Sequence, residues 1–169
     1  MPFCKLTNPF NLGTIKEHVF ASNCVETVVT FMEKESIHMD LQFVKGSYMD
    51  EIKLGDRHVL FTLEGLDEGQ EKEANEYSEK VWNWILQHHS QVLAHAGLIA
   101  SFKNKKWHVD GAPEVSPEEM REYLNQINSV YVKYEGGFDV FFDTSAIFQE
   151  RSIVVSVSKN FAFEGFKLL

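Results

Sequence analysis

Residues Glu71 to Ala96 read EKEANEYSEKVWNWILQHHSQVLAHA, and this stretch decides the fold class. Its apolar residues recur at steps of three and four, which is the period of an amphipathic helix. They are Ala74, Tyr77, Val81, Trp84, Ile85, Val92 and Ala96. Gly97 is predicted to end the helix, because glycine is common just after a helix C-terminus. The sequence therefore predicts a helical middle, and the segments on either side of it follow a different period.

The chain before this helix alternates between apolar and polar residues, as a strand with one buried face does. From Ile37 to Phe43, every second residue is apolar, which places Ile37, Met39, Leu41 and Phe43 on one sheet face. Further strands are predicted at Thr14 to Phe20, Cys24 to Met32 and His58 to Leu63, with a loop from Lys45 to Gly55. Together they predict a four-stranded antiparallel meander.

The chain after this helix contains a second helix and then more strands. Ser116-Pro117-Glu118-Glu119 has the residues of a capping box, with a proline suited to the first helical position. Two hairpins are then predicted, one of Val130 to Tyr134 with Phe138 to Phe142, and one of Ser152 to Ser158 with Phe161 to Leu168.

The predicted fold is thus one α+β domain over residues 1–169, with antiparallel sheets at both ends of the chain packed on two central helices. A subdivision into an N-terminal meander (1–65) and a unit of helices plus C-terminal sheet (66–169) stays open. The strands can form either one sheet or two lobes.

Charge is the most informative property for function. The 169 residues include 16 Lys plus Arg and 25 Asp plus Glu, for a net charge of −9. Such an excess of carboxylates argues against nucleic-acid binding, which depends on basic residues. It favours a cationic protein partner.

The acidic residues are concentrated in two segments. Glu64 to Glu79 holds seven carboxylates and one Lys, and Asp110 to Glu122 holds five carboxylates and one Arg. The predicted partner contacts are Glu71, Glu73, Glu76, Glu79, Glu118 and Glu122. If the two helix starts are neighbours, they form one continuous patch. Carboxylates at a helix start also stabilise the helix itself, so part of this charge has a structural explanation.

No catalytic or cofactor motif is present: the chain lacks HExxH, GxxxxGK[ST] and GxGxxG. His88, His89 and His95 form the nearest histidine cluster, but their spacing does not suit one metal ion, so neither a metal nor a cofactor is predicted. His108 and Asp110 are the remaining candidates for an acid/base pair, as in a small hydrolase or a ligand-binding domain with a cleft. The alternative is that both are solvated loop residues.

The remaining polar and thiol residues carry weaker expectations. Lys103, Lys105 and Lys106 beside Trp107 are predicted to lie in a solvated turn between strands. Cys4 and Cys24 are the only cysteines and do not form a CxxC pair, and Cys24 is expected to be a small buried hydrophobe. Without a signal-peptide core in the first twenty residues or an apolar run of about 18 residues, the prediction is a cytoplasmic protein outside the membrane.

The C-terminal third resembles a known pattern. Gly136 to Asp143 reads GGFDVFFD and Ile147 to Val157 reads IFQERSIVVSV. These runs, with the helix start at Ser116, are similar to the C-terminal hallmark of bacterial domains of unknown function, and the resemblance covers roughly residues 114–169. Relatives carry a Trp-Gly-His element before the SIVVS strand. This chain has Thr144-Ser145-Ala146 and Gln149-Glu150-Arg151 instead, so a site built on that histidine is absent.

The resemblance implies a small cytoplasmic protein, since some members of this grouping look like immunity proteins that protect bacteria from toxins. Together with the charge pattern it leads to a first hypothesis: a nonenzymatic protein-binding domain, more narrowly an immunity protein against a basic toxin. The small hydrolase or ligand-binding domain built on His108 and Asp110 is the second. A third is homodimer formation through the aromatic strand Phe138 to Phe142.

Overall fold

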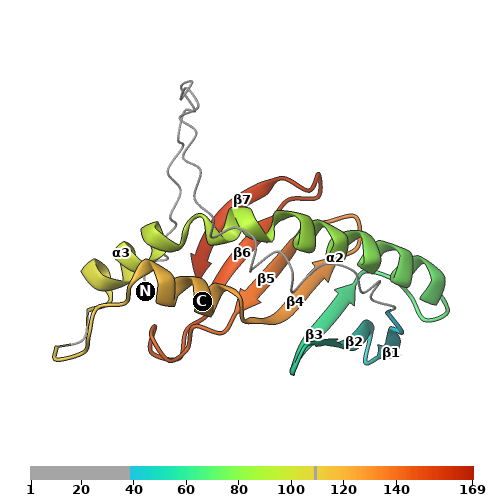
Figure 1. The fold of residues 1–169 in the computed structure, drawn as a ribbon. Helices are drawn as coiled ribbons and strands as arrows, with labels where there is room; N and C mark the ends of the chain where they lie inside the picture. The colour runs from blue at the N-terminus through green and yellow to red at the C-terminus, as the bar shows by residue number, and fades with distance from the viewer. Residues whose placement is uncertain (1–38, 109) are drawn as a thin grey trace, which may run out of the picture.

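The computed structural model describes residues 39–108 and 110–169, and these form an α+β fold with one sheet. Its strands and helices follow the order β1 (Gln42–Val44), β2 (Ser47–Leu54), β3 (Arg57–Glu64), α2 (Glu71–Leu93), α3 (Ala96–Lys106), α4 (Pro117–Leu124), β4 (Ile127–Lys133), β5 (Phe138–Phe142), β6 (Ile153–Val157) and β7 (Phe163–Leu168). The strands lie in the sheet in their chain order (Figure 1). All neighbours are antiparallel except β3 and β4, which are parallel because the three helices connect them.

The predicted α+β class and the two C-terminal hairpins are confirmed, and the described strands lie in one sheet. The predicted loop from Lys45 to Gly55 is wrong, because Ser47–Leu54 is a strand. Asp50 interrupts its apolar alternation on the inner face, where its carboxylate accepts the backbone N–H of Asp40 at 3.0 Å. The predicted strands Thr14 to Phe20 and Cys24 to Met32, with both cysteines, lie outside the described residues.

The middle of the chain contains three helices rather than two. α2 ends at Leu93, and α3 begins at Ala96, so Gly97 lies inside a helix instead of ending one. Lys103, Lys105 and Lys106 form the last turn of α3, which corrects their predicted position in a turn between strands. The capping box of α4 is confirmed: the Ser116 hydroxyl accepts the Glu119 N–H at 3.1 Å, and the Glu119 carboxylate accepts the Ser116 N–H at 2.8 Å.

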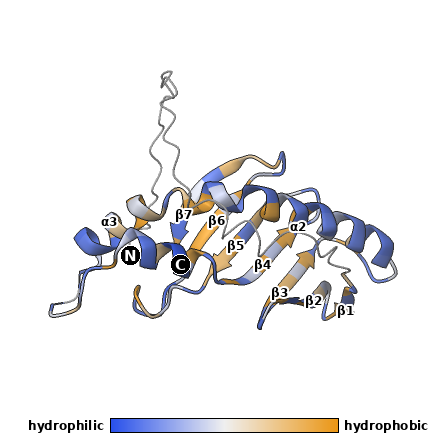
Figure 2. Cartoon of the chain, in the orientation of Figure 1, coloured by the Kyte–Doolittle hydropathy of each residue, from blue (hydrophilic) through white to orange (hydrophobic). Residues whose placement is uncertain are grey.

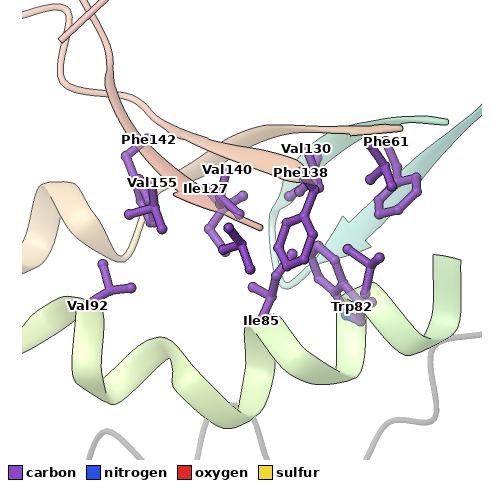
Figure 3. Packing of buried hydrophobic residues seen from close by; sticks show 14 of the residues in the cluster. Phe61, Trp82, Ile85, Val92, Ile127, Val130, Phe138, Val140, Phe142 and Val155 are labelled. Atoms are coloured by element: carbon purple, nitrogen blue, oxygen red, sulfur yellow. The ribbon is translucent and has the colours of Figure 1, made fainter. Parts of the chain in front are cut away.

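The core lies between α2 and the sheet. Figure 3 shows Trp82 and Ile85 of α2 pointing at strand residues that include Phe138 and Val140. The buried positions of α2 are Ala74, Ser78, Val81, Trp82, Ile85, His89 and Val92. This face is rotated relative to the predicted stripe, because Tyr77 and Trp84 are only half-buried. Two aromatic residues that the spacing assigns to the apolar stripe therefore lie on a flank of the helix.

The sheet face turned away from the helices carries a polar row that is in register across three strands. Tyr131 of β4 pairs with Asp139 of β5, which pairs with Ser156 of β6. The Tyr131 hydroxyl donates to Glu64 of β3, which raises the pKa of Tyr131, and the Ser156 hydroxyl donates to Asp139. Lys167 of β7 lies 3.7 Å from the same Asp139 carboxylate. These contacts join strands on both sides of the sheet centre.

Candidate functional site

The acidic start of α2 is held in place by its preceding loop. The Tyr48 hydroxyl of β2 accepts the Gln70 N–H at 2.8 Å and donates to the Asp67 carbonyl at 2.9 Å. The Gln70 side chain in turn accepts the Asp67 N–H at 2.7 Å. Because Tyr48 is fully buried, it connects this loop to the core. The carboxylates that follow Gln70 therefore project from a fixed backbone.

These carboxylates point into solvent. Asp67, Glu68, Glu71, Glu73 and Glu76 are all exposed, and we call this set the acidic end. Within this described segment one ion pair forms, between Lys72 and Glu76 at 3.8 Å, and both side chains are mostly exposed. The hydrophilic start of α2 is visible in Figure 2. Glu71 and Glu73 lie in the first helical turn, where they also stabilise the helix.

The second acidic segment is remote from the first. Glu118 and Glu122 lie on α4, whose C-terminal Asn125 contacts His89 near the end of α2. His89 is eighteen residues beyond Glu71, or about 27 Å at 1.5 Å per residue. Figure 1 shows the starts of α2 and α4 at opposite ends of the molecule. The two segments therefore do not form the continuous patch that was a possibility from sequence. Glu79, also a predicted contact, is half-buried on α2.

His108 and Asp110 do lie near each other, with 3.9 Å between the imidazole Nε2 and a carboxylate oxygen. Both are solvent-exposed, His108 at 50% and Asp110 at 108% of their side-chain surface. They lie on the connection after α3, and neither lines the pocket described below. The predicted pair therefore exists, but on an exposed loop and outside that pocket.

The three histidines His88, His89 and His95 have separate roles. His88 Nδ1 lies 2.8 Å from the Trp84 carbonyl oxygen and His95 Nδ1 lies 2.8 Å from that of Gln91, so each donates one turn back along the chain. His89 points inward and contacts Asn125. In residues 39–108 and 110–169, no three His, Cys, Asp or Glu side chains come together as metal ligands could.

His89 is the one histidine built into the core of the described fold. Its Nε2 donates to the Asn125 Oδ1 at 2.9 Å, its ring stacks on Phe142, and its Nδ1 has no partner among the described residues. Burial lowers the pKa of His89, and the hydrogen bond to Asn125 opposes this only in part. A proton on Nδ1 would place an unpaired donor and a charge in the core.

We expect the buried His89 to make the fold less stable in mild acid. Because the pKa of His89 is lower in the folded chain than its ordinary value near 6.5, the unfolded chain binds the proton more readily. The stability that depends on neutral His89 is fully present above about pH 6.5, and it is lost as the pH falls toward the pKa of His89 in the folded chain. Urea unfolding of the wild type and of His89→Gln at pH 7.5 and 5.5 measures it. The loss on acidification should be smaller in His89→Gln.

His108→Gln serves as the control, since it also removes one histidine but on the exposed loop. If His89→Gln and His108→Gln lose the same stability between the two pH values, the buried histidine is not the cause.

A shallow pocket of about 450 Å³ lies between α3 and the segment that leads into α4. Its wall on α3 includes the small residues Gly97 and Ala100, and Val115 and Pro117 lie opposite. Asn104 fixes the two walls: its amide donates to the Val115 carbonyl at 2.9 Å and accepts the Val115 N–H at 3.0 Å. None of the predicted site residues lines this pocket.

Two aromatic arrangements were not predicted from sequence. Arg151 lies over the Trp107 ring at 5.2 Å, which brings a cation to the end of α3 from a distant part of the chain. Tyr77, Trp84 and His88 line one flank of α2 together with rings from the β4–β5 and β6–β7 hairpins. Their helical spacing was visible in the sequence, but the same spacing also describes a core face.

Comparisons of the chain with protein-family models, with curated proteins and with solved structures found no match. Among the helices that the structure describes, none combines the length and the apolar character needed to cross a bilayer. The geometry and the charge of the surface are therefore the features that indicate a function.

Proposed function

We propose that this protein is a nonenzymatic binding domain that captures a cationic protein partner through the acidic end. The observation that carries the proposal is the set of exposed carboxylates at the start of α2, of which the described structure pairs only Glu76 with a lysine. Clustered charges of one sign raise the association rate of an oppositely charged partner and favour it over others.

The rigidity of the acidic end supports the same function. The loop before α2 is tied to buried Tyr48, so the backbone that carries the carboxylates is already in position before a partner binds. Binding to a preformed surface has a smaller entropic cost than binding to a mobile one. Together with the resemblance to bacterial domains of which some look like immunity proteins, this favours a basic toxin as the partner.

Charge reversal of Glu71, Glu73 and Glu76 to lysine is expected to weaken binding of a cationic probe by at least about tenfold at low salt, because three favourable charge contacts become repulsive. The probe is a decapeptide of lysine, and the measurement is its Kd by calorimetry at two salt concentrations. The dependence of Kd on salt should also fall, since fewer charges take part.

A matched control comes from the other acidic segment. Reversal of Glu114, Glu118 and Glu122 changes the net charge from −9 to −3, as reversal at the acidic end does, because each exchange adds two positive charges. If both triple variants lose the same affinity, binding follows the overall charge of the protein and the acidic end is not the site.

A further inference from the structure

A continuous row of rings lies beside the acidic end, and we call it the aromatic flank. It consists of Tyr77, Trp84 and His88 on α2, Tyr134 after β4 and Phe161 before β7. Tyr77 lies 5.0 Å from Tyr134 and 6.4 Å from Phe161, as measured between ring centroids. Buried Phe138 joins the two groups of rings, because its centroid lies 5.7 Å from that of Phe161 and 5.4 Å from that of Trp84.

The aromatic flank shares one stripe of α2 with the acidic end. Glu73, Tyr77, Lys80, Trp84 and His88 follow one another at steps of four, three, four and four, so they lie along the same side of the helix. The five flank residues are half-buried rather than enclosed in the core. A partner that contacts Glu73 therefore meets Tyr77 one turn further along.

One cation already lies on this row. Lys80 is exposed, and its Nζ lies 4.6 Å from the centroid of the Phe161 ring, which is within the range of a cation–π contact. The face of this ring is therefore open to a positive group. Further along, Trp84 and His88 stack face to face, with centroids 4.2 Å apart and planes 13° apart, so one face of the Trp84 ring is covered by His88.

We propose that the aromatic flank binds arginine side chains of the cationic partner. This inference rests on the proposed function, and it names the chemistry of the partner beyond its charge. A guanidinium is planar and stacks on aromatic faces, whereas an ammonium is compact and strongly hydrated. Tryptophan gives the strongest cation–π contacts, so Trp84 is the central residue. The carboxylates attract the partner, and the rings select arginine over lysine.

The experiment compares two probes, decapeptides of arginine and of lysine, by calorimetry on the full chain. The wild type should bind the arginine peptide about three- to fivefold more tightly than the lysine peptide, which is within the range of one exposed cation–π contact. Trp84→Leu should remove this preference without changing the affinity for lysine. Trp84→Phe, which keeps a ring, should retain part of it.

Lys80→Ala provides a variant that does not disturb the rings. It frees the Phe161 face and should strengthen arginine binding more than Lys105→Ala, which removes an exposed lysine of α3. This comparison tests the inference even if Trp84→Leu fails to fold.

The outcomes separate the inference from the proposed function. If Trp84→Leu keeps the full preference for arginine, or if Lys80→Ala matches Lys105→Ala, the aromatic flank is not the arginine site, and the acidic end is unaffected. If the wild type binds neither peptide, the proposed function is wrong and the inference is lost with it.

Discussion

Replacing Trp82 with alanine is expected to lower the free energy of unfolding by about 3–5 kcal/mol. Trp82 is 2% exposed and among the largest fully buried side chains of the fold, and Figure 3 shows it between α2 and the sheet. Its indole N–H has no hydrogen-bond partner among the described residues, so the loss comes from apolar contacts and from the cavity left behind. Domains of this kind are stable by only about 5–15 kcal/mol, so one substitution removes a large share.

Trp84→Ala is the matched control, since it removes the same side chain two residues away on the half-buried flank. Its cost should be clearly smaller, because less apolar surface is buried there. Urea unfolding followed by circular dichroism measures both variants. Equal losses would mean that α2 packs on the sheet in a different rotation from the one described.

Gly137→Ala is expected to destabilise the fold by about 2–3 kcal/mol, at the upper end for overpacking. A Cβ atom at Gly137 would lie 2.4 Å from the carbonyl oxygen of Val157 on β6. The obstacle is backbone, which cannot move without disturbing the pairing of Phe138 with Val157. The effect should therefore be seen as partial separation of β5 from β6, as well as a lower unfolding midpoint.

Gly97→Ala is the same exchange at a position where we expect the stability to rise instead of fall. Gly97 lies in α3, and a Cβ atom there meets nothing within 4 Å. Alanine is the better helix former by about 0.5–1 kcal/mol, so this variant should be more stable than the wild type. A stabilising Gly137→Ala, or a strongly destabilising Gly97→Ala, would contradict the positions given to β5 and α3.

The elements best predicted from sequence are those fixed by local contacts. The capping box at Ser116 and Glu119 closes within four residues, and the β4–β5 hairpin is marked by Gly136 and Gly137. The end of α2 was predicted three residues too late, at Ala96, because Ala94 and His95 are ordinary helical residues, and α3 itself was missed. β2 was missed because its inner Asp50 is satisfied by a backbone group ten residues away.

In the candidate site, too, the local features could be predicted from the sequence and the long-range arrangement could not. Exposure of Glu71, Glu73 and Glu76 follows from charge alone, and the structure agrees with it. The separation of the two acidic segments depends on where α4 docks, which is mainly on α3, with Asn125 also contacting His89 of α2, 36 residues away in sequence. The position of β5 inside the sheet also leaves it no free edge for self-association, because both sides are paired with β4 and β6. Homodimer formation through another surface stays a prediction.

The parallel pairing of β3 with β4 has a consequence for folding kinetics. Phe61 pairs with Val130, so this contact closes a loop of about seventy residues. Every other strand pair of the described sheet is joined by a much shorter connection. Contacts distant in sequence form slowly, because the entropy of loop closure is lost before the contact stabilises the chain. We expect the two groups of antiparallel strands to form first. The pairing of β3 with β4 is then the step that limits the folding rate. It follows formation of the helices between the two strands, which shortens the distance that the connecting chain has to close.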